Sequence, residues 1–164
     1  MPNWCSNSLT IKGDASTLVA LKEIIESDGE GLLEAIAPIG EWDYDKAVAH
    51  WGTKWDISAE GLEYTDNGDG TAEITGWFDS AWAPPIEAFQ SLADDWDSCY
   101  IELLYEEPGM CFVGCWDSEG ADDHYEYSDF TSDNIKDNVP AYLVEHFALD
   151  ERLDMYEQEE EEMG

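Results

Sequence analysis

The chain has 164 residues, a length typical of one folded domain, and negative charge dominates its composition. It holds 40 Asp and Glu against 6 Lys and Arg, for a formal net charge of -34, yet 43% of its residues are hydrophobic and 13% are aromatic. This aromatic content predicts a folded domain and excludes a purely solvated polyanion. The shortage of basic side chains argues against direct binding to the phosphates of a nucleic acid.

The first predicted strand covers residues 7–13, where Leu9 and Ile11 alternate with polar residues. A helix is expected to begin near Asp14, a residue that can cap it, and to continue to Ser27. Its apolar residues recur at helical spacing, so the chain begins with a strand followed by an amphipathic helix.

Residues 28–50 lose this periodicity, apart from one or two helical turns before Pro38, and we expect them to form an insertion. Residues 51–56 are predicted to lead into a second strand. The Asp-Asn-Gly-Asp-Gly sequence at 66–70 is a strong turn signal, and apolar residues then alternate over residues 72–78. These two strands are expected to form a hairpin.

The pair Pro84-Pro85 favours the start of a second helix, whose apolar stripe continues to Trp96. A fourth strand is predicted around residues 99–105 and a fifth over residues 110–116. The order is then βαββαβ with one extra hairpin strand. This order predicts an α+β fold with a ferredoxin-like, split βαβ antiparallel sheet.

The predicted ferredoxin-like domain covers residues 1–117, and the rest of the chain is mostly acidic. Residues 118–149 are expected to form an acidic, aromatic extension with a short helix from Pro140 to Leu149 that packs on the domain. Residues 150–164 carry a run of like charges and are expected to be disordered.

Four segments in this order resemble the YubB-type ferredoxin-like domain family of phages and conjugative plasmids, over about residues 1–117. They are MPNWCSN at residues 1–7, WGTKWD at 51–56, FDSAWAPP at 78–85 and YEEPGMCFVG at 105–114. The resemblance implies the same fold, an origin in a mobile element and the cytoplasm of a host cell. It implies no catalytic residue, because the family has no established activity.

Cysteine content and the lack of targeting signals agree with a cytoplasmic location. The N-terminus has no basic region followed by an apolar run, and no stretch of about 18 apolar residues occurs. Four cysteines are too few for a disulfide scaffold. We therefore expect a cytoplasmic protein with reduced cysteines.

The negative charge is unevenly distributed along the sequence. Residues 1–56 contain 10 acidic and 4 basic residues, whereas residues 57–164 contain 30 acidic and 2 basic residues. Acids and aromatics alternate after residue 116, and we interpret them as a surface that binds a basic partner protein. The residues of this expected surface are Asp117, Glu119, Asp122, Asp123, Tyr125, Glu126, Tyr127, Asp129, Phe130 and Asp133.

The leading hypothesis is an acidic inhibitor, encoded by a phage or plasmid, whose carboxylates replace phosphates in the groove of a nucleic-acid-binding host protein such as a defence nuclease. The alternative is a protein-interaction module, for instance a replication or assembly accessory, whose acidity serves only solubility or salt adaptation. Both remain open from the sequence. Neither hypothesis involves direct nucleic-acid binding, a membrane or a cofactor.

A second candidate surface comes from the segments that carry the family resemblance. Lys54 lies between two tryptophans and could stack on an indole ring. The other interpretation is that these tryptophans fill the core while the lysine stem covers them. The residues of this surface are Trp51, Lys54, Trp55, Asp56 and Trp82.

Metal binding and catalysis are not expected. Cys111 and Cys115 lie four residues apart on a predicted strand, about 13 Å from each other, which is too far for two sulfurs on one zinc ion. Residues 66–70 lack the ligand spacing of a calcium loop. The three histidines stand apart, and no nucleophile with a matching base or phosphate-binding loop is evident, so we expect no enzyme activity.

Overall fold

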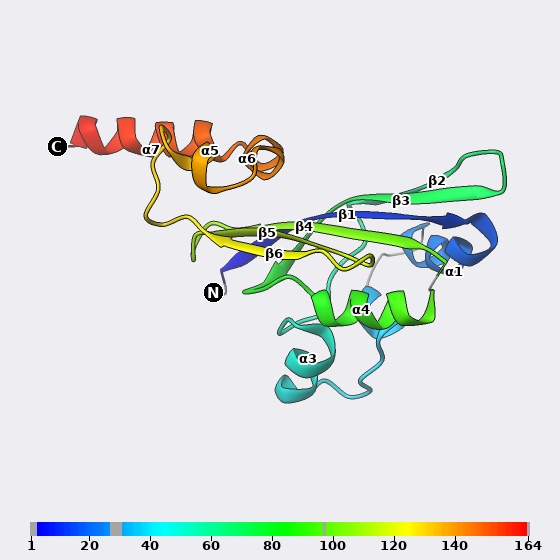
Figure 1. Cartoon of the computed structure of the whole chain (residues 1–164). Coiled ribbons are helices and arrows are strands. Elements are labelled where there is room, and N and C mark those ends of the chain that lie inside the picture. The colour runs from blue at the N-terminus through cyan, green and yellow to red at the C-terminus, as the bar shows by residue number, and fades with distance from the viewer. Residues whose placement is uncertain (1–2, 27–30, 97, 164) are drawn as a thin grey trace.

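The computed structural model describes residues 3–26, 31–96 and 98–163. Within these ranges, six strands form one antiparallel sheet with the order β2-β3-β1-β4-β5-β6, and helices lie on both of its faces (Figure 1). The strands are β1 (Trp4–Asp14), β2 (Leu62–Asp66), β3 (Thr71–Ala81), β4 (Tyr100–Glu107), β5 (Phe112–Asp117) and β6 (Asp122–Glu126). The helices are α1 (Ala15–Glu26), α2 (Leu32–Ile36), α3 (Tyr44–Trp51), α4 (Ile86–Asp95), α5 (Ile135–Asn138), α6 (Ala141–Phe147) and α7 (Leu149–Met163).

The predicted ferredoxin-like arrangement is confirmed. The elements β1, α1, β2, β3, α4 and β4 follow one another in the βαββαβ order, with α2 and α3 inserted between α1 and β2. The strand order β2-β3-β1-β4 places β1 between the two strands that it pairs with antiparallel, β3 and β4. The predicted extra hairpin strand is β5, which pairs with β4.

The larger core lies between the sheet and the layer formed by α1, α2, α3 and α4. Alternate β1 residues point into it, and Leu9 and Ile11 are almost completely buried, as the sequence pattern predicts. Leu18 and Leu21 of α1 and Phe89 of α4 cover them. This layer lies below the sheet in Figure 1.

The part of the predicted insertion that the structure describes is more regular than expected, while residues 27–30 lie outside the described residues. The Asp43 carboxylate accepts a hydrogen bond from the Lys46 N–H at 3.0 Å and caps α3. Ala47 and Trp51 are buried one turn apart. Residues 51–56 were predicted to lead into a second strand; Trp51 instead ends a helix, and β2 begins further along the chain, at Leu62.

A smaller core lies on the opposite face of the sheet, under α5, α6 and α7 (Figure 1). Its buried residues come from β4, β5 and the C-terminal segment; they are Leu104, Val113, Cys115, Tyr127, Ile135, Val139, Leu143, Val144, Phe147 and Leu149. The edge strand β6 was not predicted, because Asp-Asp-His-Tyr-Glu has no apolar alternation and pairs with β5 through its backbone.

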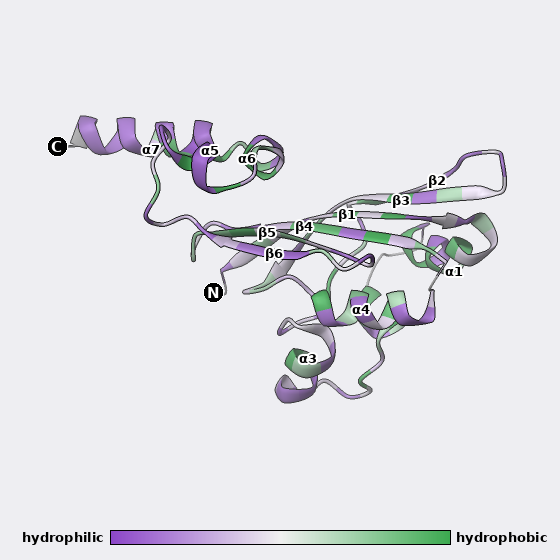
Figure 2. Cartoon of the chain, in the orientation of Figure 1, coloured by the Kyte–Doolittle hydropathy of each residue, from purple (hydrophilic) through white to green (hydrophobic). Residues whose placement is uncertain are grey.

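The acidic C-terminus is helical where disorder was expected. Ala148, in a left-handed conformation with φ 52°, ends α6, and α7 then runs to Met163. Leu149 is buried at its start, and Arg152 forms an ion pair with Glu106 of β4. Tertiary contacts therefore hold the first turns of a helix whose outer half is hydrophilic (Figure 2). Residue 164 lies outside the described residues.

No helix in the described part of the chain is both long and apolar enough to span a lipid bilayer.

Candidate partner-binding groove

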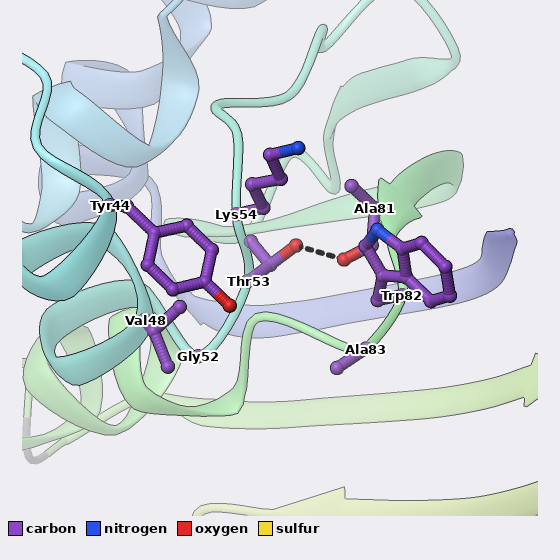
Figure 3. Close-up of a pocket in the computed structure, with 8 residues that line it drawn as sticks. All are labelled: Tyr44, Val48, Gly52, Thr53, Lys54, Ala81, Trp82 and Ala83. Atoms are coloured by element: carbon purple, nitrogen blue, oxygen red, sulfur yellow. Dashed lines mark hydrogen bonds between the residues drawn. The ribbon is translucent and has the colours of Figure 1, made fainter. Parts of the chain in front are cut away.

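A groove forms where the end of α3 meets the end of β3. Gly52 adopts a left-handed conformation with φ 84° and donates its N–H to the Val48 carbonyl at 3.1 Å, which ends α3. The next residue, Thr53, is buried and its hydroxyl donates to the Ala81 carbonyl at 2.7 Å (Figure 3). These contacts fix the segment after α3 against the end of β3.

Trp82 follows β3 directly and is held in an unusual backbone conformation. Its φ is 71°, a left-handed value that costs a non-glycine residue roughly 1–2 kcal/mol. Its N–H donates to the Asn3 carbonyl at 2.8 Å, and its indole is 46% exposed. Strained residues of this kind cluster at functional sites, and the strain here places a large aromatic ring in solvent.

A buried hydrogen-bond chain supports the turn that contains Trp82. The Asn7 side-chain amide donates to the Ser80 hydroxyl at 2.9 Å, and that hydroxyl donates to the Ala83 carbonyl at 2.6 Å. Asn7 and Ser80 are almost fully buried. The strained turn is therefore fixed on both sides by the sheet below it.

The first hollow of the groove lies between α3 and Trp82 and has a volume of about 430 Å³. Tyr44 of α3 and Trp82 lie on opposite sides of Thr53, and the Lys54 side chain extends away from the hollow (Figure 3). Tyr44 is 55% exposed. The lining residues are Tyr44, Val48, Gly52, Thr53, Lys54, Ala81, Trp82 and Ala83.

A second hollow, of about 490 Å³, shares Gly52, Trp82 and Ala83 with the first. It also reaches the sheet and combines apolar, aromatic and acidic side chains. Its remaining lining residues are Pro84, Ile86, Glu87, Tyr105, Phe112, Asp122 and His124. We refer to the two hollows together as the Trp82 groove.

The floor of the second hollow is aromatic. The Tyr105 hydroxyl lies 3.3 Å from Nδ1 of His124, and the ring centroids of Phe112 and His124 are 4.9 Å apart. Burial raises the pKa of Tyr105, with smaller contributions from nearby groups such as Asp122. The phenol therefore stays neutral near pH 7.

Further exposed tryptophans lie near the first hollow. Lys54 Nζ lies 4.6 Å from the centroid of Trp55, whose ring is 6.2 Å from that of Trp4. The indole N–H of Trp42 donates to the Lys54 carbonyl at 2.9 Å. Lys54 therefore stacks on an indole ring, as one of the two interpretations predicted, and a role of this surface in binding stays a prediction.

Trp51 and Asp56 do not belong to this surface. Trp51 is 3% exposed and donates its indole N–H to the Ala37 carbonyl at 2.8 Å, so it is a core residue. The Asp56 carboxylate accepts hydrogen bonds from the N–H groups of Leu33 and Glu34 at 2.7 and 3.0 Å, and so stabilises the start of α2. The other three predicted residues, Lys54, Trp55 and Trp82, reach solvent.

The acidic surface predicted after residue 116 loses its aromatic members. Tyr127 is 4% exposed and donates to a Glu106 carboxylate oxygen at 2.6 Å, so the prediction that it contacts a partner was wrong. Burial and this hydrogen bond raise the pKa of Tyr127. Tyr125 and Phe130 are partly buried and pack against the smaller core. These rings anchor the C-terminal layer to the sheet.

Asp117 also has a structural role, because its carboxylate accepts the N–H groups of Glu119 and Ala121 at 2.9 and 3.0 Å. It closes the turn between β5 and β6. The remaining predicted acids are exposed, and of these Asp122 lines the Trp82 groove. The exposed acids are Glu119, Asp122, Asp123, Glu126, Asp129 and Asp133. The fold therefore brings the two candidate surfaces together at Trp82 and Asp122.

Most carboxylates lack a basic partner. Within the described ranges, ion pairs join Lys136 to Asp150 at 3.4 Å and Arg152 to Glu106. Exposed acids occur on α1, α3, α4, the β2–β3 hairpin and β6, and α7 alone contains eight acids, six of them exposed. The uncompensated charge therefore covers several sides of the molecule, with its highest density on α7.

The sequence predicted Lys54, Trp82 and Asp122 among the residues that line the groove but not the others, which include Tyr44, Thr53 and Glu87. Tyr44 fell in the segment expected to be an irregular insertion, and Glu87 resembled any exposed helical acid. The one available signal was Trp82 followed by Ala-Pro-Pro, which must end a strand and leave a large ring next to a turn.

Cys5, Cys99 and Cys115 are buried, and Cys111 is partly buried. Burial raises the pKa of Cys5 and of Cys115, which lowers the reactivity of both thiols. Across the described residues, no group of three or more His, Cys, Asp or Glu side chains is arranged to hold a metal ion.

Comparison with known proteins places the chain in a family. Residues 50–162 match the family model described as the ferredoxin-like domain in Api92-like protein. The chain therefore belongs to this family. The matched range includes the end of α3, the Trp82 groove apart from Tyr44 and Val48, and the C-terminal layer, so the family domain extends beyond residue 117, where the sequence resemblance ended.

One solved structure is similar, that of protein api92 from Yersinia pseudotuberculosis, at 26% sequence identity and a TM-score of 0.35. The similarity covers 53% of this chain and 30% of that chain, so this protein spans less than a third of its structural relative. No curated protein matches the chain.

Proposed function

We propose that this protein is an acidic binding protein that occupies the nucleic-acid-binding surface of a basic partner. The observation that carries the proposal is the uncompensated charge: the chain has 40 acidic residues, and among the described residues Glu106 and Asp150 pair with a basic side chain. A partner rich in Lys and Arg supplies the missing positive charge. Such a partner otherwise binds phosphates, which the carboxylates replace.

The Trp82 groove is the proposed centre of this interaction. Its exposed rings and its acids Glu87 and Asp122 combine desolvated aromatic contact with charge, which is the composition of energetically dominant interface residues. The surrounding acids on α3 and β6 then act over a longer range and increase the association rate. The distribution of charge over several sides favours a partner that wraps around the domain over one that contacts a single flat face.

The proposed biological setting follows the family resemblance: a phage or plasmid protein acting in the host cytoplasm on a defence nuclease or a similar enzyme. The second candidate is an interaction module for replication or assembly. The observation that favours it is the spread of acids over many elements, which also suits a protein whose charge serves only solubility.

A capture experiment separates the two. The whole chain is immobilised, incubated with a bacterial lysate, and the captured proteins are eluted with excess duplex DNA or with salt raised from about 0.1 to 1 M, which shortens the screening length from about 10 to 3 Å. Elution of nucleic-acid-binding proteins by both treatments supports the proposed function. A specific partner that stays bound in excess DNA contradicts it and supports the interaction module.

Two charge variants locate the contact. One carries Asp122→Asn, Asp123→Asn and Glu126→Gln on β6, and the other changes the four glutamates 159–162 of α7 to glutamine. We expect the β6 variant to lose more of the captured partner, because Asp122 lines the groove and its two neighbouring acids lie on the same strand. If the α7 variant alone loses capture, the proposed centre of the interaction is wrong.

A further inference from the structure

We propose that the second hollow of the Trp82 groove is a binding site for an arginine side chain of the partner, with the guanidinium between the indole of Trp82 and the carboxylates of Glu87 and Asp122. This inference rests on the proposed function and specifies which basic residue the groove selects. Three features of the hollow support it: a tryptophan ring with no described cation over it, two carboxylates without a described ion pair, and a backbone that holds the ring in place.

Two of the described aromatic rings stack with lysines of the same chain. In the described part of the chain, Lys22 lies 5.2 Å from the centroid of Tyr64 and Lys54 lies 4.6 Å from that of Trp55. Trp82 is 46% exposed and no lysine or arginine of the described residues stacks on it. Its face is therefore available to a cation from another molecule, and tryptophan binds cations best among the aromatic residues.

The two acids of the hollow are also unpaired. The structure gives neither Glu87 nor Asp122 a hydrogen bond from its carboxylate or an ion pair with any described residue, although both line the hollow. Glu87 lies in the first turn of α4 and Asp122 at the start of β6. They therefore reach the hollow from separate elements and can each accept hydrogen bonds from one ligand.

Arginine fits this chemistry better than lysine. Its planar guanidinium stacks on an indole while its edge donates to carboxylates, and it carries five donors against three on an ammonium. It is also more weakly hydrated, so it enters a hollow lined by Pro84, Ile86 and Phe112 at a lower desolvation cost. The apolar walls accommodate the methylene stem.

The strained Trp82 turn holds the ring ready for this contact. The φ of 71° persists because Asn3, Ser80 and Ala83 hold the backbone around it with hydrogen bonds. A ring already fixed in the bound orientation loses little conformational entropy when the ligand arrives.

The test compares two soluble peptides of equal length and charge, alternating Gly-Arg and alternating Gly-Lys, titrated against the whole chain by calorimetry. We expect the arginine peptide to bind about five- to tenfold more tightly than the lysine peptide. Trp82→Ala and Asp122→Asn are each expected to bring this ratio close to one. Circular dichroism of each variant checks that the sheet is intact.

Two matched controls separate the site from general charge and general aromatic contact. Trp55→Ala removes an exposed indole that Lys54 already covers, and Asp123→Asn removes an equal charge from the residue next to Asp122, which points to the other face of β6. Both are expected to keep the preference for arginine.

Equal binding of both peptides, weakened by salt and unchanged by Trp82→Ala, would overturn the arginine site while leaving the proposed function standing. Loss of the preference in Asp123→Asn as much as in Asp122→Asn would also overturn it, because the effect would then be one of total charge. Retention of the preference by the variants at 82 and 122, together with a captured partner that stays bound in excess duplex DNA, would overturn both proposals.

Discussion

The two faces of the sheet are covered in different ways. The face under α1 and α4 is sealed by a large, continuous apolar core, whereas the face under α5, α6 and α7 is sealed by a smaller core and one ion pair with a buried carboxylate. The first face holds the groove, whose residues are fixed by hydrogen bonds to β1 and β3. The second face carries the densest charge. The groove thus lies on the side with the larger core, and the densest charge lies on the side with the smaller core.

The largest effect on stability is expected from a substitution that breaks the attachment of the C-terminal layer to the sheet. Arg152→Ala leaves the Glu106 carboxylate, 5% exposed, without its charged partner, and we expect a loss of about 3–5 kcal/mol in the free energy of unfolding, measured by urea denaturation. Lys136→Ala, which removes the exposed pair with Asp150, is the control and is expected to cost at most about 1 kcal/mol. Equal losses in the two variants would contradict the distinction between the pairs.

A second prediction asks whether the two cores unfold separately. Leu143→Ala in the smaller core and Leu9→Ala in the larger core each remove a fully buried side chain, at a cost of about 2–5 kcal/mol. Because the C-terminal layer depends on the smaller core, Leu143→Ala is expected to speed hydrogen exchange mainly in α6 and α7. Leu9→Ala is expected to speed exchange across the sheet and both layers. The same exchange pattern in both variants would mean that the chain unfolds as one unit.

A third prediction tests whether the left-handed backbone of Trp82 is strained. Trp82→Gly removes both the indole and the left-handed strain, whereas Trp82→Ala removes the indole alone. The glycine variant is expected to be more stable than the alanine variant by up to about 1 kcal/mol in thermal unfolding, although both lose the ring. An alanine variant at least as stable as the glycine variant would show that the backbone of this turn is relaxed.

The smallest effect is expected in the pH dependence of stability, through a histidine on the face of the sheet under α5, α6 and α7. His146 of α6 stacks on Trp77 of β3 with ring centroids 5.0 Å apart, and burial lowers the pKa of His146, with Glu102 opposing the shift. The unfolded chain therefore takes up the proton first. The stabilising contribution of neutral His146 is complete above its unfolded pKa of about 6.5 and declines as the pH falls from there to the folded pKa.

The measurement is the free energy of unfolding between pH 7.5 and 5 for the wild type and for His146→Gln, with the difference isolating this residue from the many carboxylates. We expect the advantage of the wild type to shrink toward acid pH. An advantage of the wild type that grows toward acid pH would mean that folding raises the pKa of His146 and does not lower it.

The sequence predicted the βαββαβ plan because each of its elements carries its own local signal. The alternation around Leu9 and Ile11, the turn at residues 66–70 and the paired prolines before α4 all depend on near neighbours in the chain. The strand β6 and the helix α7 have no such signal, since β6 is held by its pairing with β5 and α7 by Leu149 and Arg152. Their polar sequences therefore resembled a loop and a disordered tail.

The sequence by itself determined the net charge and the strand and helix order, since these follow from composition and local pattern. Only the tertiary structure decided which tryptophans are core and which are surface, and that Tyr127 is buried while Asp122 faces the groove. Such assignments depend on residues far apart in the chain. Trp82, Glu87 and Asp122 meet because β3, α4 and β6 converge at one end of the sheet, a proximity that sequence spacing does not encode.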